Sequence, residues 1–274
     1  MNRIGININR TKERNKEIVD FVKCTILNNL NDAEVIVLDE VEANKELLSS
    51  LDMVISLGGD GTILSTSRLL EEVPVPIFGV NIGNLGFLTS SDLMGFEEEL
   101  INIINGKYTV EDRMLLNCNV YGKTESNYKA LNDLVICKGT LARIVKFDIY
   151  IDGELFTSFK ADGVIVSTPT GSTAYSLSAG GPILYPTLEA ISITPICPHL
   201  LGMRTLVVKS DCKIKIEYTL NTDKVFLTVD GQWSREMEDK EFVTIEAAKE
   251  TCRLITTENY SYFKVLRNKL LITQ

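Results

Sequence analysis

The sequence predicts an α/β domain followed by an all-β domain, and three observations support this. Before Tyr108, continuously apolar runs alternate with helix-like segments, which is typical of a parallel sheet covered by helices. Beyond Tyr108, many short β-rich runs are separated by turn residues, as in an antiparallel sandwich. Over residues 260–271 the pattern becomes helix-like again. We therefore expect an α/β domain over residues 1–110, a β-rich domain over residues 111–259, and a tail, 260–274, that packs back on the first domain.

The first domain contains short apolar runs that we expect to form its parallel sheet, at residues 4–8, 34–38, 53–57 and 76–80. Helix-like patterns separate or follow these runs, at residues 12–30, 42–51, 63–70 and 96–105. Strands that alternate with helices in this way build a Rossmann-like parallel-sheet domain.

The second domain contains β-rich runs at residues 116–121, 129–137, 145–151, 163–166, 206–209, 214–218 and 225–229. Turn residues punctuate them, for example Asp152-Gly153. Closely spaced strands of this kind favour a β-sandwich-like domain.

The composition limits the kinds of partner that we expect. The formal net charge of -9 argues against a nucleic-acid partner, because such domains usually carry a basic face. No apolar run approaches the roughly 20 residues of a membrane-spanning helix, and the N-terminus lacks the pattern of a signal peptide. The six cysteines are scattered, which fits reduced thiols in a cytoplasmic protein. We expect a cytoplasmic protein without a membrane or nucleic-acid partner.

A glycine-rich loop, Gly58-Gly59-Asp60-Gly61-Thr62, joins the third expected strand to a helix. Glycines at such a turn let main-chain N–H groups approach a ligand, and the start of the helix favours an anion. The loop is neither a Walker A motif nor a G-x-G-x-x-G fingerprint. Its carboxylate would repel a phosphate unless it holds a cation or takes a proton, and both roles suit phosphoryl transfer. The alternative is an ordinary turn in which Asp60 caps the helix.

A second segment, residues 162–182, is dense in hydroxyl groups and small residues. Such a surface offers hydrogen-bond donors and acceptors with little bulk, which suits ribose and phosphate oxygens. A bland Ser/Thr-rich loop is the alternative, but loops of this length inside a compact domain usually have a function.

Together these segments resemble the NAD kinase family. The resemblance rests on the glycine loop, on Asn132-Asp133 and on residues 162–182, with further matches at residues 79–88, 194–199 and 230–232. It covers nearly the whole chain from Leu57 onward. The glycine loop alone is shared with diacylglycerol, sphingosine and phosphofructokinase-type kinases, whereas residues 162–182 are far more specific.

The resemblance implies an activity and a set of site residues. Members of the family phosphorylate the adenosine-ribose 2′-hydroxyl of NAD, usually with ATP and a divalent metal ion such as Mg²⁺, and they are homodimers or homotetramers. Asp60 would accept the proton of that hydroxyl, and no metal ligand set comes from the protein alone. The dinucleotide would bind in the β-rich domain and contact Gly61, Asn132, Asp133, Arg143, Lys160, Asp162, Thr173, Ala174, Tyr175, Ser176, Leu177, Ser178 and Gln232. Asn81 and Phe87 would flank the adenine.

Two positions depart from the family pattern, and two other functions stay open. Many relatives carry Arg where this chain has Lys160, and Glu is frequent where it has Asp133.

His199, the only histidine, is expected to pack in a partly buried connection rather than to act in catalysis. One alternative is a lipid kinase, which would bind the nucleotide with the same kind of glycine loop but would need a basic or apolar patch that faces the membrane. The other is a non-catalytic module that senses the dinucleotide, which would not need the carboxylate of Asp60.

Overall fold

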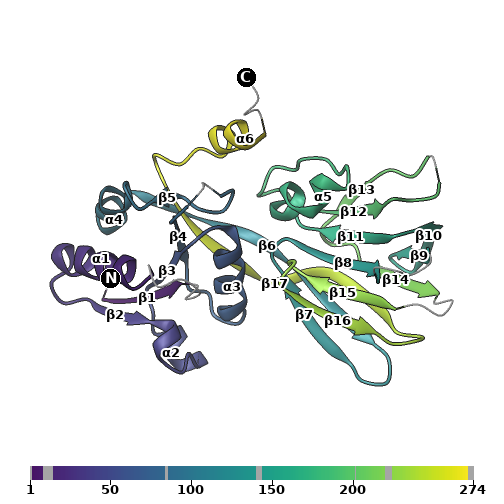
Figure 1. The fold of residues 1–274 in the computed structure, drawn as a ribbon, viewed down its shortest axis with the longest axis horizontal. Coiled ribbons are helices and arrows are strands. Elements are labelled where there is room, and N and C mark those ends of the chain that lie inside the picture. The colour runs from purple at the N-terminus through teal and green to yellow at the C-terminus, as the bar shows by residue number, and fades with distance from the viewer. Residues whose placement is uncertain are drawn as a thin grey trace. The chain divides into compact units, whose positions relative to one another are not determined.

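The computed structural model describes residues 2–8, 15–83, 86–139, 144–200, 202–219 and 224–270. The chain divides into two compact units, the first made of Met1–Asp112 with Cys252–Gln274 and the second of Arg113–Thr251 (Figure 1). The sequence placed the end of the second domain at residue 259. The unit ends earlier because the last strand, β17 (Phe242–Thr257), pairs with the first unit's sheet where Leu254 lies beside Ile77.

The first unit is built on a parallel sheet in the order β2-β1-β3-β4. Its strands are β1 (Arg3–Ile8), β2 (Glu34–Val37), β3 (Met53–Leu57) and β4 (Ile77–Asn81), with the short β5 (Ser91–Asp92) beside β4. Its helices are α1 (Asn15–Asn29), α2 (Lys45–Ser49), α3 (Asp60–Leu69), α4 (Phe96–Ile104) and α6 (Tyr262–Leu270), with a 3₁₀ turn, η1 (Leu38–Glu40), after β2. Every residue of β3 and β4 is buried, which explains why these strands read as continuous apolar runs.

A buried polar network anchors helix α3 to the sheet. The side-chain amide of Asn7, on β1, donates to the Thr66 hydroxyl at 2.7 Å, and Thr66 in turn lies 3.0 Å from the hydroxyl of Ser56 on β3. All three side chains are buried, so each needs a hydrogen-bond partner, and the network fixes the helix against two strands.

The second unit is a pair of antiparallel sheets around one apolar core. One sheet has the order β13-β12-β11-β8-β15-β16, and the other contains β10-β9-β14-β17 together with β6 and β7. The strands are β6 (Tyr108–Tyr121), β7 (Ser126–Ala130), β8 (Asp133–Lys138), β9 (Val145–Ile151), β10 (Glu154–Ala161), β11 (Gly163–Ser167), β12 (Ala190–Ile196), β13 (Leu206–Lys209), β14 (Ile214–Thr219), β15 (Val225–Val229) and β16 (Trp233–Met237). The core takes side chains from both sheets, for example Val164 and Phe147, so the two sheets form a sandwich.

Strands β10, β12, β16 and β17 (Phe242–Thr257) were not among the expected runs, and three other segments differ from the sequence prediction. The expected strand at residues 129–137 is two strands, because the chain turns at Leu131 and Asn132. The hydroxyl-rich segment, to which the sequence assigned no helix, contains the 3₁₀ turn η2 (Thr170–Thr173) and the short helix α5 (Tyr175–Ser178). Helix α3 begins at Asp60, so the last residues of the glycine loop form its first turn.

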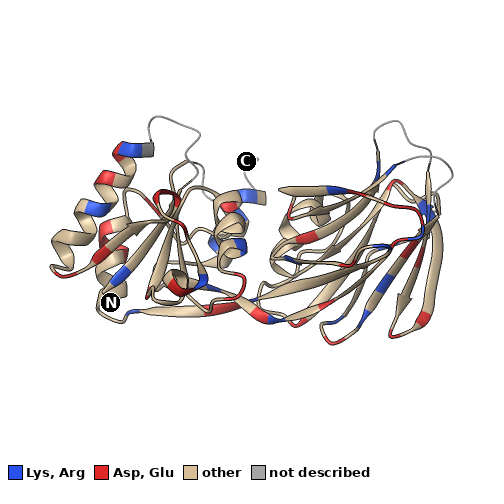
Figure 2. Cartoon of the chain, turned by 90° about the horizontal axis from the view of Figure 1, so that it is seen from below, with Lys and Arg blue, Asp and Glu red and all other residues tan. Residues whose placement is uncertain are grey.

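Charged residues are interspersed along the described helices and strands of both units (Figure 2). Acidic residues outnumber basic ones, 37 to 28, over the whole sequence. Within the parts of the chain that the structure describes, no helix is long and apolar enough to cross a membrane.

Candidate active site

The glycine loop begins where strand β3 ends, and its first two glycines have different roles. A Cβ atom on Gly58 would lie 1.9 Å from the hydroxyl of Thr62, whose side chain is itself buried, so only glycine fits there. A Cβ on Gly59 would meet nothing within 4 Å. Gly59 precedes the first residue of α3, so the open space lies at the start of a helix, where N–H groups and the helix dipole favour an anion.

The carboxylate of Asp60 is fixed by the loop that follows β4. Its Oδ2 accepts a hydrogen bond from the backbone N–H of Phe87, and its Oδ1 accepts one from the N–H of Leu88, each at 2.9 Å. A Cβ on Gly86 would lie 2.0 Å from Asp60 Oδ1, so glycine at this position lets the backbone approach the carboxylate closely. Both oxygens are therefore oriented, and each keeps lone pairs for a further donor.

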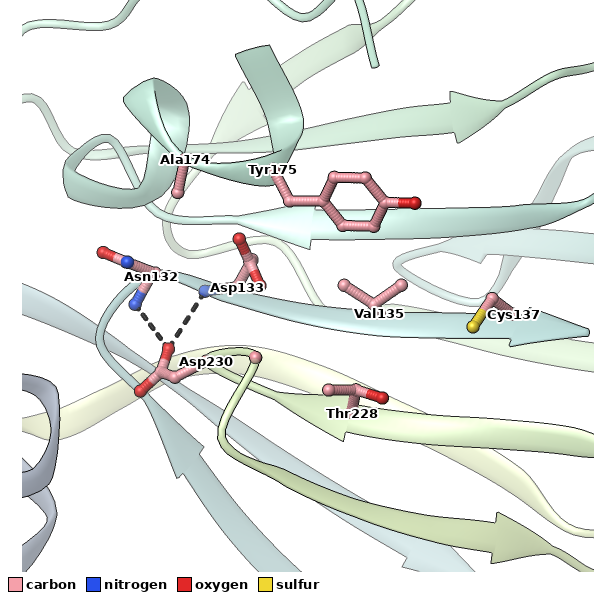
Figure 3. Close-up of a pocket in the computed structure, with 9 residues that line it drawn as sticks. Asn132, Asp133, Val135, Cys137, Ala174, Tyr175, Thr228 and Asp230 are labelled. Atoms are coloured by element: carbon pink, nitrogen blue, oxygen red, sulfur yellow. Dashed lines mark hydrogen bonds between the residues drawn. The ribbon is translucent and has the colours of Figure 1, made fainter. Parts of the chain in front are cut away.

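In the second unit a pocket of about 350 Å³ opens on the sheet that contains β8, β11 and β15 (Figure 3). Its lining comes from strands β8 and β15, from the turns at their ends and from the start of α5: Asn132, Asp133, Val135, Cys137, Ala174, Tyr175, Thr228, Asp230 and Gly231. The ring of Tyr175 lies along one side of the pocket above Val135, and the side chains of Asn132 and Asp133 lie at one end.

Asp230 holds the turn between β7 and β8 in place. Its carboxylate accepts three backbone N–H groups: Leu131 at 3.1 Å, Asn132 at 2.7 Å and Asp133 at 3.2 Å. Asp230 and Gly231 have φ angles of 51° and 65°, and the N–H of Gln232 bonds to the carbonyl of Val229, which is a tight hairpin turn of the type that requires positive φ. The Asp-Gly pair thus supplies both the turn and the acceptor that fixes Asn132 and Asp133.

Asp133 is buried beside this second carboxylate. Burial, and then the negative charge of Asp230, raise the pKa of Asp133 to about 7, while a hydrogen bond from the backbone N–H of Tyr175 acts in the opposite direction. A carboxyl group with this pKa is present in both protonation states near neutral pH. It can therefore donate to or accept from a sugar hydroxyl.

Most hydroxyl groups of residues 167–176 bind the protein itself. Thr168 donates to the Leu131 carbonyl at 2.6 Å, Ser172 donates to the Pro169 carbonyl at 2.6 Å, and Ser176 lies 3.0 Å from the hydroxyl of Thr194. A Cβ on Gly171 would lie 2.1 Å from the carbonyl oxygen of Asn132, so this segment packs directly on the Asn132 turn. These hydroxyl groups therefore hold the segment to itself, to the Asn132 turn and to strand β12.

Comparisons with known protein families and sequences identify the family of this chain. It matches the family models of the ATP-NAD kinase N-terminal domain over residues 7–108 and of the ATP-NAD kinase C-terminal domain over residues 131–257. A curated NAD kinase of Clostridium perfringens is 45% identical over 272 residues, which are 98% of this chain and 99% of that protein. The chain belongs to the NAD kinase family. An NAD kinase of Clostridium beijerinckii is 44% identical over 273 residues, 99% of this chain and 96% of that protein.

Solved structures of NAD kinases have the same fold. The structure of yeast NADH kinase complexed with NADH matches with a TM-score of 0.88 at 26% identity, over 100% of this chain and 88% of that one. An NAD kinase from Archaeoglobus fulgidus in complex with ATP matches with a TM-score of 0.77 at 30% identity, over 97% of this chain and 98% of that one. The resemblance to NAD kinases and the fold class predicted from the sequence are both confirmed.

The residues implied by the NAD kinase resemblance have different surroundings. Asn132, Asp133, Ala174 and Tyr175 line the pocket of the second unit. Ser176 is fully buried against Thr194, whereas Thr173 is partly buried and donates to the Thr170 carbonyl at 3.3 Å. Leu177 is partly buried, and Ser178 and Gln232 are exposed.

Two charged residues implied by the resemblance, Lys160 and Asp162, lie on strand β10 or directly after it. Lys160 is exposed on β10, and its carbonyl accepts the N–H of His199 at 2.8 Å. Asp162 follows β10 and pairs with Lys138 Nζ at 3.0 Å, at the end of β8. Arg143 lies outside the described residues. His199 itself is exposed, contrary to the packing role expected for it, because it lies in the exposed connection after β12.

The remaining candidates belong to the first unit. Gly61 is exposed in the first turn of α3. Asn81 is buried at the end of β4, where its side-chain oxygen accepts the N–H of Gly83 at 2.6 Å. Phe87 is partly buried, and its backbone N–H donates to Asp60.

Sequence reasoning did not assign a role to Asp230, Cys137 or Thr228, which line the pocket of this NAD kinase. The Asp230-Gly231 pair is a strong turn signal, so a turn at this place was accessible from the sequence. Cys137 and Thr228 lie on antiparallel neighbouring strands, and only the register of those strands shows that they share a pocket.

Proposed function

We propose that Asp60 accepts the proton of the adenosine-ribose 2′-hydroxyl of NAD while that oxygen takes the γ-phosphoryl group of ATP. This is the NAD kinase reaction, and the chain is an NAD kinase by its match to curated NAD kinases over nearly its whole length. The observation that supports Asp60 as the base is its carboxylate, which is fixed at the start of α3 by the N–H groups of Phe87 and Leu88.

The transfer is an in-line displacement. The 2′-oxygen forms a bond to the γ-phosphorus, and the bond from that phosphorus to the oxygen bridging the β- and γ-phosphates breaks, so that ADP leaves with the electron pair. The hydroxyl proton goes to Asp60. A carboxylate whose two oxygens are already oriented loses little freedom when it meets the hydroxyl, which is the condition for efficient general-base catalysis.

We assign the dinucleotide to the pocket of the second unit. Asn132 offers both a donor and an acceptor to ribose hydroxyls, and Asp133 offers a carboxyl group near its pKa. Tyr175 presents a half-exposed ring on which a base can stack. Lys160 and Arg143 supply positive charge for the diphosphate, and Asp162 contacts the nicotinamide side.

We assign the phosphates of ATP to the glycine loop, where Gly59 leaves open space at the start of α3. Within the described residues, no group of three or more His, Cys, Asp or Glu side chains is placed to hold a metal ion. Mg²⁺ usually binds through substrate phosphates with one or two carboxylates. We therefore propose that the divalent ion enters as part of the ATP complex.

The test is to incubate the purified protein with NAD, ATP and Mg²⁺ and to measure NADP with an NADP-specific dehydrogenase. NADH should be tested as a second acceptor, because a structural neighbour is an NADH kinase. We expect NADP to form, and we expect Asp60→Asn to bind NAD normally while kcat falls by about two to four orders of magnitude. Absence of NADP under conditions in which NAD binds would exclude the kinase function and favour a dinucleotide sensor.

A matched control is Asp20→Asn, which removes the same charge from an exposed position on helix α1 of the same unit. We expect its kcat to equal that of the wild type. If Asp60→Asn retains the wild-type kcat as well, Asp60 is not the base. Phosphorylation of a lipid acceptor in place of NAD would support the lipid kinase alternative.

We further propose that the protein is cytoplasmic, which its six scattered cysteines favour, and that it forms a homodimer or a homotetramer, as the family resemblance implies. Light scattering of the purified protein measures the oligomeric state directly, and a monomeric mass at assay concentrations would contradict this proposal.

A further inference from the structure

The loop that holds Asp60 is itself held from its other side by the C-terminal segment of the chain. Ser90 donates through its hydroxyl to the carbonyl of Ile255, on β17, at 2.7 Å. Farther along, the hydroxyl of Tyr260 donates to the carbonyl of Phe87 at 3.4 Å. The ammonium group of Lys269, on α6, lies 5.9 Å from the centre of the Phe87 ring. These residues all belong to the first unit.

One peptide group connects Tyr260 to Asp60. The carbonyl of Phe87 and the N–H of Leu88 belong to the same planar peptide unit. Its oxygen accepts from Tyr260, and its N–H donates to Asp60 Oδ1 at 2.9 Å. A donor at the carbonyl end polarises the peptide and strengthens the N–H as a donor at the other end. The Tyr260 hydroxyl, the peptide and the Asp60 carboxylate therefore form a continuous hydrogen-bonded chain.

Other hydrogen bonds hold the residues on either side of the Phe87–Leu88 peptide, including one from the N–H of Ser90 to the Gly79 carbonyl at 2.9 Å. Gly86 allows the close approach to Asp60 but contributes no side chain, and its N–H is taken up by the Thr89 hydroxyl at 3.1 Å. The Tyr260 bond acts on the peptide whose rotation would tilt the N–H of Leu88 away from the carboxylate.

We propose that Tyr260 is a positioning residue for catalysis, which acts through the Phe87–Leu88 peptide to orient the carboxylate of Asp60. This rests on the proposed role of Asp60 as the base. The hydroxyl of Tyr260 bonds to the Phe87 carbonyl, so it reaches the carboxylate through that peptide. Its effect must therefore appear in the chemical step and depend on the carboxylate.

The kinetic test compares Tyr260→Phe with Tyr108→Phe. Both variants lose one phenol oxygen from the first unit, and Tyr108 is a partly exposed residue of β6. We expect Tyr260→Phe to lower kcat by roughly two- to tenfold, the effect of one lost hydrogen bond, without changing KM for NAD or ATP. Tyr108→Phe should match the wild type. An unchanged kcat in Tyr260→Phe, or a rise in both KM values alone, would overturn the proposal.

A double variant shows whether the effect passes through Asp60. In the Asp60→Asn background, Tyr260→Phe should change kcat by less than about twofold, because the group that it orients is already gone. If Tyr260→Phe lowers kcat by the same factor in both backgrounds, Tyr260 acts on something else.

A third measurement does not depend on activity. Hydrogen exchange at the backbone N–H of Leu88 should be faster in Tyr260→Phe than in the wild type, while exchange along β12 in the second unit stays unchanged. If the wild type makes no NADP but Leu88 exchange responds as expected, the kinase role of Asp60 fails and the positioning contact stands. If Leu88 exchange does not respond, the positioning role of Tyr260 fails whatever the activity.

Discussion

Asp133 and Asp230 are joined by two hydrogen bonds across the turn that forms one end of the pocket in the second unit. The N–H of Asp133 donates to the Asp230 carboxylate at 3.2 Å, and the N–H of Asp230 donates to the Asp133 carbonyl at 2.9 Å. The same arrangement brings two carboxyl groups together in a buried place, and it contributes to the high pKa of Asp133. The turn that fixes the backbone of Asp133 therefore also raises the pKa of its carboxyl group.

Replacing Asp133 with Asn should change how stability depends on pH. The pKa of Asp133 is raised from 3.8 to about 7 on folding, so between these values the native state binds more protons than the unfolded state. The contribution of Asp133 to the free energy of unfolding therefore decreases as the pH rises through the window from 3.8 to about 7, by up to about 1.4 kcal/mol per pH unit. Urea denaturation across the window should show Asp133→Asn gaining stability relative to the wild type as the pH rises. A difference that is constant with pH would contradict this.

Replacing Gly86 with Ala should impair turnover more than folding. The added Cβ would lie 2.0 Å from Asp60 Oδ1 and 2.7 Å from its Cγ, so either the carboxylate or the loop must move. A displacement of about 1 Å at a reacting group can cost about a hundredfold in rate, and we expect a fall in kcat of that order. Gly202→Ala, where the new Cβ meets nothing within 4 Å, is the control for steady-state kinetics. A wild-type kcat in Gly86→Ala would show that the loop need not hold Asp60 closely.

Replacing Gly171 with Ala should weaken both the second unit and its affinity for NAD. The new Cβ would meet the carbonyl oxygen of Asn132 at 2.1 Å, and a backbone atom cannot rotate away as a side chain can. Overpacking of this kind typically costs about 1–3 kcal/mol. Thermal melts and calorimetric titration with NAD would measure the two effects. An undisturbed affinity would show that the position of Asn132 does not matter for binding.

Removing divalent metal should stop turnover without unfolding the protein. If the ion enters with ATP, a chelator such as EDTA should abolish NADP formation, and added Mg²⁺ should restore it. The melting temperature without nucleotide should stay the same with and without EDTA, since a structural ion would stabilise the native state. A lower melting temperature in EDTA would reveal an ion bound by the protein itself.

The sequence predicted local features of the site well. An apolar strand that runs into glycines and then into a helical pattern is a local signal, so the position of Asp60 at a strand-to-helix turn could be read directly. The alternation of apolar strands and helices likewise predicted the parallel sheet of the first unit.

The hydrogen-bond partners that fix Asp60 and Asn132 could not be predicted, because they are distant in sequence from the residues that they hold. The donors to Asp60 are Phe87 and Leu88, and the acceptor that fixes the Asn132 turn is Asp230. The expected strand at residues 129–137 is interrupted just before Asp133, and Asn132 and Asp133 are residue types that disfavour strands and often form turns. The distant partners Asp230 and Thr168 hold the chain in this turn.

The pairing of Leu254 with Ile77 sets the order in which the molecule can be completed during synthesis. A ribosome releases the chain from its N-terminus, so all of Arg113–Thr251 emerges before Cys252–Gln274, the segment that completes the first unit. The β-rich unit has its whole sequence available first. In the unit that carries Asp60, the pairing of Leu254 with Ile77 and the contact of Tyr260 with Phe87 can form only after those later residues have emerged.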